Sequence, residues 1–431
     1  MSNSIDLIGR DLGTPFDPAD PIEQQDWEEW TIPPSSGEMG ADLLAQTPNS
    51  RAVRLLDPSL VAGGLPLVPG GEGEFDVLLP TPDRVEPDRF FDTRGLHHDL
   101  DVPLNVPGLG LVNIWSFRTT LPDDTQVAPW PARTIRCREG EVVHSRMANR
   151  NGPHTIHHHG IEPTPMNDGV GHLTMDINDG ALYDYQWRAG EAGTYFYHCH
   201  VNTVLHFEMG MYGMLIIDPD VPGAPFVDGG PGAVMVGNNP VGYDAEAIWA
   251  ADDIDVRWHS TVNHPNYSPE SGIVSGGFVS ITDPENPRLH DFNPTVFVVS
   301  GVPAPVAPGG DGTLLTGAGA TTTFGQKLLV RALNASYCTT RWRFPGTLQG
   351  TVVGIDGRTL GRSPFGSYSA PYSLSSVNHQ FQLTTAQRWD ILIDTGTAAS
   401  LGQHVVEVDY HHWYTDARLF TVRLPIQVNP A

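Results

Sequence analysis

The sequence predicts an all-β protein, with tandem Greek-key β-sandwiches or barrels that follow an irregular N-terminal extension. Two observations lead to this fold class. Short runs of alternating apolar and polar residues recur at a spacing of roughly ten residues, which is typical of sandwiches and barrels. The 431 residues also include 46 glycines and 38 prolines, a composition that favours short strands and turns over long helices.

Composition divides the chain into three segments. Residues 1–92 are rich in Pro, Asp and Gly and have only short periodic runs, so we expect an irregular extension there. Residues 93–222 form a first strand-rich domain, and residues 223–431 form a second. A stretch rich in Pro and Gly, Pro219 to Pro231, reads as the linker between them.

Period-two alternation marks the individual strands, as in Tyr183 to Trp187. In the first domain we expect strands at 111–117, 134–138, 142–149, 183–187, 193–197 and 213–218. In the second we expect them at 233–236, 295–299, 327–332, 351–355, 380–383, 390–393, 405–408 and 419–422. Long loops are expected near 239–293 and 301–325.

Charge and composition exclude several function classes. The chain carries 24 basic and 50 acidic residues, for a net charge of −26. A nucleic-acid partner is therefore not expected, because phosphate binding needs clustered Lys and Arg. No apolar run reaches the roughly 18 residues of a membrane span. The start of the chain has no basic segment followed by an apolar one, so no signal peptide is expected in it.

One short segment combines a cysteine with three histidines and two methionines. Cys199 and the histidines lie within nine positions, and Met209 and Met211 follow directly. A thiolate, two imidazoles and a weak axial thioether form a blue-copper electron-transfer site. Cys199 and one histidine of this segment would supply two of these ligands, and His154 is the natural donor of the missing imidazole.

The spacing of the other histidines predicts a second site. Residues i and i+2 of a strand share a face, so His198 and His200 point one way while Cys199 points the other. His157 and His159 likewise share a face. Two such pairs on neighbouring strands would make a four-imidazole site, and the Cys199 backbone would connect it to the copper on the opposite side.

These segments resemble the copper domain of the multicopper oxidase family, laccase-like proteins with the cupredoxin fold. The family pattern is His-x-x-His-x-His-Gly, then His-Cys-His, then a His five residues before a Met. The matching residues here are His154, His157, His159, Gly160, His198, Cys199, His200, His206 and Met211. The strand Gly193 to Tyr197 before His-Cys-His matches as well.

The resemblance implies a role for each of these residues. The implied type 1 copper ligands are His154, Cys199, His206 and Met211, with Met209 as a rival axial ligand. The implied ligands of type 2 and type 3 coppers are His157, His159, His198 and His200. Cys199, His198 and His200 would carry electrons between the two sites. His158 stands where many family members have Trp, as a supporting residue or a spare ligand.

The chain departs from the family in its number of histidine pairs. A full trinuclear cluster takes eight histidines in four His-x-His pairs, and only two pairs are present. The second domain resembles the copper-free middle domain of the family, in Val330 to Ser336, Ile355 to Gly357 and Gln387 to Leu392. Either a neighbouring subunit completes the cluster or fewer coppers bind.

Three functions follow from the resemblance. The first is a copper-dependent oxidoreductase that oxidises a small reducing substrate and reduces dioxygen to water, working as a dimer or trimer. The second is an enzyme similar to the copper nitrite reductases, although the second histidine of His-Cys-His argues against it. The third is a blue-copper electron carrier or copper-binding protein with a degenerate cluster. The family implies a periplasmic or extracellular location.

Overall fold

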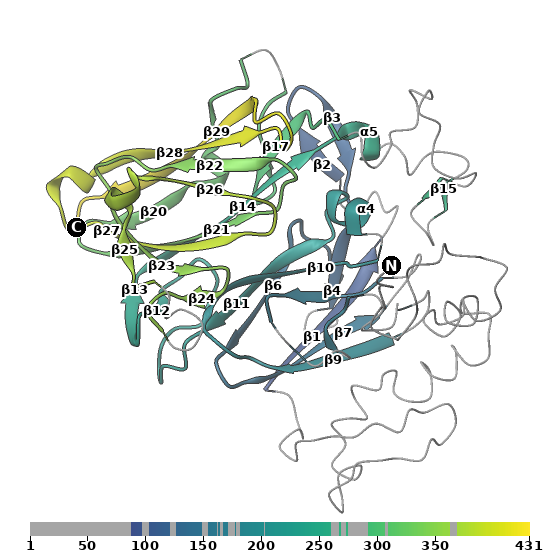
Figure 1. Cartoon of the computed structure of the whole chain (residues 1–431), viewed down its shortest axis with the longest axis horizontal. Helices are drawn as coiled ribbons and strands as arrows, with labels where there is room; N and C mark the ends of the chain where they lie inside the picture. The colour runs from purple at the N-terminus through teal and green to yellow at the C-terminus, as the bar shows by residue number, and fades with distance from the viewer. Residues whose placement is uncertain are drawn as a thin grey trace, which may run out of the picture.

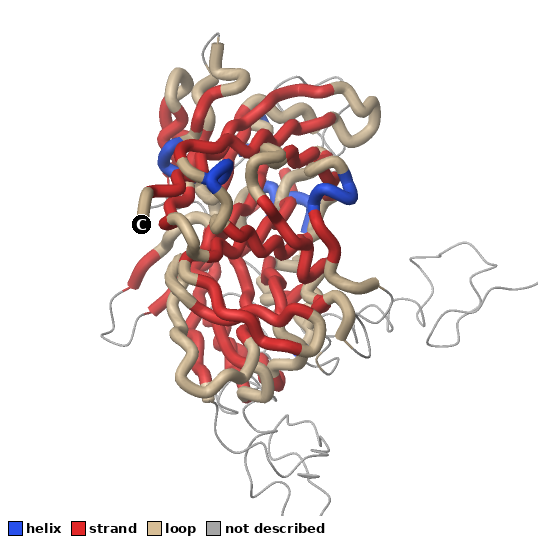
Figure 2. Tube along the Cα trace, turned by 90° about the vertical axis from the view of Figure 1, so that its left-hand side faces the viewer, coloured by secondary structure: helices blue, strands red, loops and turns tan. Residues whose placement is uncertain are grey.

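The structure is a computed structural model in which most of the described residues lie in β-strands (Figures 1 and 2). It describes residues 88–96, 103–120, 126–148, 154–161, 163, 167–170, 177, 182–201, 203–259, 267–268, 273–274, 292–306, 309–362 and 369–431. Of the predicted extension, residues 1–92, the part up to residue 87 lies outside the described residues. The all-β fold class is confirmed.

The first half of the molecule, elements β1 to β11, consists of two facing sheets. One sheet has the order β5-β4-β1-β7-β9 and the other β6-β11-β10-β8. The strands of the first sheet are β1 (Arg89–Leu96), β4 (Ser116–Thr120), β5 (Gln126–Val127), β7 (Val142–Ala148) and β9 (Leu182–Arg188). Those of the second are β6 (Ala132–Arg138), β8 (His157–His159), β10 (Gly193–His198) and β11 (Tyr212–Asp218).

Two further pieces complete the first half. A hairpin is formed by β2 (Pro103–Val106) and β3 (Gly110–Asn113), and the short helix α4 (Thr203–Glu208) connects β10 to β11. The pairs β1–β7 and β6–β11 are parallel while their neighbours are antiparallel. Parallel neighbours need crossover connections, and such crossovers between two packed sheets distinguish this sandwich from a simple meander.

The second half, elements β12 to β29, repeats the two-sheet plan on a larger scale (Figure 1). Its eight-stranded sheet contains β14 (Ala245–Ile254), β17 (Val296–Val299), β18 (Val302–Pro303), β21 (Lys327–Asn334), β23 (Gln349–Ile355), β24 (Arg358–Thr359), β25 (Tyr372–Ser373) and β27 (Arg388–Asp394). Its six-stranded sheet contains β19 (Thr313–Leu314), β20 (Ala320–Thr323), β22 (Thr339–Arg343), β26 (Gln380–Leu383), β28 (Gly402–His411) and β29 (Arg418–Asn429).

Small elements lie beside these sheets. They are the hairpins β12 (Gly232–Val236) with β13 (Asn239–Tyr243) and β15 (Tyr267–Ser268) with β16 (Ile273–Val274), the helix α5 (Val256–His259), and 3-10 turns at Thr316–Ala318, Leu374–Val377 and Ala398–Ser400. Among the described residues, the helices are too short and too polar to cross a membrane.

Several elements differ from the sequence-based expectation, since the expected long loop 301–325 contains the short strands β18, β19 and β20, and two differences concern longer strands. Strand β1 begins at Arg89, so the last residues assigned to the extension belong to the first sheet. The segment expected as a long loop, 239–293, contains the ten-residue strand β14, which pairs with β17 and β21. The Ala and Asp residues of β14 have low strand propensity, and partners from distant parts of the chain stabilise it.

The two halves pack closely against each other. An apolar cluster joins Phe196 and Met214 of the first half to Ala250, Leu333 and Ala335 of the second. Further along the contact, buried arginines and carboxylates from both halves form ion pairs. The members of this ionic network are Arg136, Asp218, Glu246, Arg331 and Asp390. The contact brings second-half side chains close to the histidine-rich segments.

Candidate metal centre

Strand β10 carries the central part of the site. All its residues from Gly193 to His198 are buried, as expected for a strand covered on both faces. It pairs with β8 in a register that places Phe196 opposite His159 and His198 opposite His157. The two His-x-His segments, almost forty residues apart in sequence, are therefore neighbours in the sheet.

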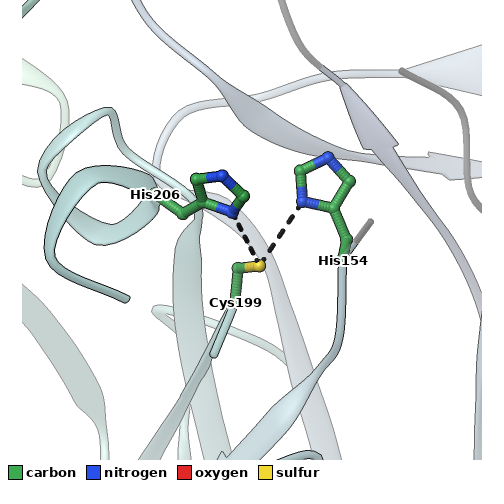
Figure 3. A group of neighbouring side chains, drawn as sticks. All are labelled: His154, Cys199 and His206. Atoms are coloured by element: carbon green, nitrogen blue, oxygen red, sulfur yellow. Dashed lines mark hydrogen bonds between the residues drawn. The ribbon is translucent and has the colours of Figure 1, made fainter. Parts of the chain in front are cut away.

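The first candidate site is formed by His154, Cys199 and His206 (Figure 3). Nδ1 of His154 lies 3.4 Å from Sγ of Cys199, and Nδ1 of His206 lies 3.1 Å from the same sulfur. The three potential ligand atoms lie within 4.8 Å of one another, and all three residues are buried. Two imidazole nitrogens and a sulfur thus face one point inside the protein.

Helix α4 and the turn after it place His206 beside Cys199. The amide of Met211 donates to the carbonyl of His206, and the amide of Cys199 donates to the carbonyl of Met211. Met209 instead accepts a hydrogen bond at its carbonyl from the amide of Trp115. Both methionines are fully buried in the same core cluster as Cys199. The backbone of Met211 therefore contacts both neighbouring candidate ligands.

The second candidate site is formed by His157, His159 and His198, whose potential ligand atoms lie within 4.8 Å of one another. Nδ1 of His159 is 3.3 Å from Nε2 of His198. The ring of His200 lies 5.3 Å from that of His157 and 5.7 Å from that of His198, between centroids. The structure thus brings three of the four predicted imidazoles together and places the fourth at their edge.

Backbone carbonyls orient two of these imidazoles. Nδ1 of His157 lies 2.7 Å from the carbonyl oxygen of Asp168, and Nδ1 of His198 lies 2.9 Å from the carbonyl oxygen of Cys199. A carbonyl can only accept, so both Nδ1 atoms carry hydrogen and each Nε2 keeps its lone pair. Hydrogen bonds of this kind fix the tautomer of metal-binding histidines.

His158 points away from both groups. It is fully buried, and its ring packs 5.4 Å from Tyr185 and 5.3 Å from Trp187 on β9. Alternation along β8 explains this, since His157 and His159 occupy the opposite face. Burial, with a smaller contribution from His157, lowers the pKa of His158 to about 3. His158 is therefore a neutral core residue, which favours the supporting role over that of a spare ligand.

Burial also keeps three of the candidate histidines neutral. It lowers the pKa of His206 to about 3. Burial, followed by the charge of Arg388, lowers the pKa of His159 to about 3, and burial, followed by His157 and His159, lowers that of His198 well below its usual value. A neutral imidazole is the form that binds a metal ion, so these three histidines need no deprotonation near neutral pH.

Several residues that contact the candidate ligands were not identified from the sequence. Trp115 lies edge-on to the ring of His206, with centroids 5.5 Å apart. Arg388, from the second half, lies with its guanidinium carbon 5.6 Å from the centroid of Phe196, which stacks on His159. Trp115 lies in none of the copper motifs, and Arg388 lies in the segment Gln387 to Leu392, which resembles the copper-free middle domain of the family. Only the folded chain brings both residues to the site.

Comparison with known proteins agrees with this geometry. The multicopper oxidase family profile matches residues 127–222. Multicopper oxidase CTB12 of Cercospora beticola is 40% identical over 127 residues, which cover 28% of this chain and 19% of that protein. Copper resistance protein A of Pseudomonas syringae pv. tomato is 28% identical over 247 residues, covering 53% of this chain and 37% of that protein.

Solved structures show the same fold. Blue copper oxidase from Nitrosomonas europaea superposes with a TM-score of 0.51 over 79% of this chain and 86% of that chain, at 21% identity. The profile match covers the segment that contains the candidate ligands, and the likeness to the solved structure shows that the chain shares its fold. The matched segments span less than half the length of the two curated relatives.

Proposed function

We propose that this protein is a copper-dependent oxidoreductase that oxidises a small reducing substrate by one electron at a time and reduces dioxygen to water. One observation carries the proposal: the adjacent residues Cys199 and His198 belong to two different groups of potential metal ligands. A single peptide unit therefore connects the two groups. Such a link suits transfer of electrons from one metal site to the other.

The donor set of the first site fits copper. His154, Cys199 and His206 offer two imidazoles and one thiolate, and Met211 is our proposed weak axial ligand because its backbone contacts both Cys199 and His206. Paired cysteines, which structural zinc sites favour, are lacking here. Copper bound to this set would alternate between cuprous and cupric states, which mixed nitrogen and sulfur ligands both accommodate.

The chain's own residues then have distinct tasks. Cys199 and His206 are buried, so water is kept away from the thiolate and little rearrangement accompanies a change of charge. The carbonyl of Cys199 accepts the hydrogen bond from Nδ1 of His198. This bond adds a second connection between the sites, parallel to the covalent one, and holds Nε2 of His198 toward the second group.

The second group offers ligands for type 2 and type 3 coppers, namely His157, His159, His198 and His200. Because these are only two His-x-His pairs, we propose that a homo-oligomer, a dimer or trimer, completes the cluster. A closed symmetric assembly would present the same patch on every subunit. We also propose a periplasmic or extracellular location, on the family resemblance alone.

The decisive experiment measures copper per chain together with the optical and electron paramagnetic resonance spectra of the copper-loaded protein. Three or four coppers, with both blue and normal cupric signals and oxygen consumption in the presence of a reductant, are the expected result. One copper per chain with a blue signal alone would indicate an electron carrier rather than an oxidase. A protein that binds copper without any blue absorption would overturn the assignment of the first site.

A further inference from the structure

Residues 203–211, here called the ligand loop, carry His206 and end at Met211. The first half of the molecule holds this loop on one side, where the amide of Trp115 donates to the carbonyl of Met209 at 2.7 Å. Trp130 also donates from its indole to the carbonyl of Gly210 at 3.1 Å. These contacts fix the end of the loop.

The second half contacts the same loop through Glu208. Oε1 of Glu208 accepts a hydrogen bond from the amide of Asp255 at 2.8 Å and lies 3.5 Å from Nε2 of His259. The side chains of Glu208 and His259 are each only 2% exposed. Nδ1 of His259 faces the carbonyl of Asn113 at 2.5 Å, so it carries the hydrogen and directs Nε2 toward Glu208.

A second contact from the same half reaches the start of the loop. The hydroxyl of Tyr337 donates to the carbonyl of Val204 at 2.5 Å. Tyr337 is itself fixed, because its amide donates to Oδ1 of Asp253 at 2.9 Å and its ring packs 6.1 Å from that of Phe207. His206 therefore lies between two anchor points, Val204 and Glu208, that the second half provides.

We propose that Glu208 and Tyr337 are positioning residues through which the second half holds the ligand loop and so sets the distance between His206 and Cys199. The inference rests on the proposed function for its copper chemistry, since it concerns the same site. The structural part of the inference is independent of the proposed function. A loop released from these contacts would open more often and expose Cys199, whether or not a metal binds. The second half, which offers no His-x-His pair of its own, thereby gains a role at the metal centre.

The metal-free protein tests the structural part. All three cysteines are buried thiols outside any disulfide, so the rate at which a thiol reagent labels Cys199, followed peptide by peptide, reports opening of the loop. Tyr337→Phe should raise this rate about three- to tenfold, the range for loss of one hydrogen bond. Labelling of Cys137, in the core of the first half, should not change in the same sample.

Matched variants separate positioning from general destabilisation. Tyr410→Phe removes an equivalent hydrogen bond, from the hydroxyl to the carbonyl of Val298, but lies in the core of the second half and should leave labelling of Cys199 unchanged. Glu208→Gln keeps a side-chain oxygen that can accept the hydrogen bond from the amide of Asp255, so it should behave like the parent. Glu208→Leu should accelerate labelling as Tyr337→Phe does.

Copper loading then tests the effect on the site. Tyr337→Phe and Glu208→Leu should shift the blue absorption band and the reduction potential, whereas Tyr410→Phe and Glu208→Gln should not. Equal labelling rates and equal spectra in Tyr337→Phe and Tyr410→Phe would refute the inference while leaving the proposed function intact. If the parent protein itself shows no blue band, the proposed function fails, and the labelling rates still decide whether the second half holds the loop.

Discussion

Replacing Glu246 by glutamine is expected to weaken the contact between the two halves of the molecule. Glu246 lies on β14, and its carboxylate accepts hydrogen bonds from Arg136 of the first half at 2.8 Å and from Arg331 of the second half at 2.6 Å. All three side chains are at most 7% exposed. Glutamine keeps the shape but removes the charge that both guanidinium groups need.

The pKa of Glu246 provides the magnitude. Burial alone would raise it, but the charges of Arg331 and Arg136 outweigh burial and lower the pKa from 4.5 to about 2. At about 1.4 kcal/mol per pKa unit, the ionised form of the folded protein is favoured by about 3 kcal/mol. Because glutamine resembles the protonated carboxyl, Glu246→Gln should lower the free energy of unfolding by about 3 kcal/mol at pH 7.

Urea unfolding of the metal-free protein, followed by tryptophan fluorescence, measures this difference. The pKa of Glu246 is lower in the folded state, so its contribution is complete above pH 4.5 and is lost as the pH falls toward 2. The difference between parent and variant should shrink by more than half at pH 3.

The matched control is Glu407→Gln, which removes a carboxylate from the partly exposed arginines Arg343 and Arg423. It should cost less than about 1 kcal/mol. A loss below 1 kcal/mol for Glu246→Gln at pH 7, or one that does not depend on pH, would show that the buried charges do not hold the halves together.

Three further predictions concern the site and its surroundings. Cys199→Ser should abolish the blue absorption of the copper-loaded protein without unfolding it. Cys137→Ser, which changes another buried thiol, should keep the blue absorption. Blue absorption in Cys199→Ser would show that the type 1 site lies elsewhere. Gly169→Ala should disturb the second site more than the first, because a Cβ there would lie 1.9 Å from the carbonyl oxygen of Ile156, next to His157. Metal titration at both sites checks this, and equal losses would contradict it. Asp253→Asn should remove a pH dependence of stability whose sign is opposite to that of Glu246. Burial raises the pKa of Asp253 from 3.8 to about 6, so the free energy of unfolding of the parent falls by about 3 kcal/mol as the pH rises through this range. Identical urea curves of parent and variant from pH 4 to 7 would contradict this prediction.

Local patterns were enough to predict much of the fold. The alternating runs at Tyr183 to Trp187 and Gly193 to Tyr197 are strands of the two facing sheets of the first half. Strand β14 could not be found in this way. Its carboxylates are buried only because arginines and backbone amides from distant segments contact them, as Arg331 does for Glu246 and the amide of Cys338 does for Asp253.

The amino-acid sequence alone determined the all-β fold class, the family resemblance and the set of candidate ligands. The alternation of side chains along a strand also predicts that the neighbours His198 and Cys199 face opposite sides, because side-chain direction along a strand is a local property. Only the tertiary structure decided which distant residues surround those ligands. Trp115, Tyr337 and Arg388 reach the site through the packing of sheets and halves, and such long-range contacts leave no periodic signal in the sequence.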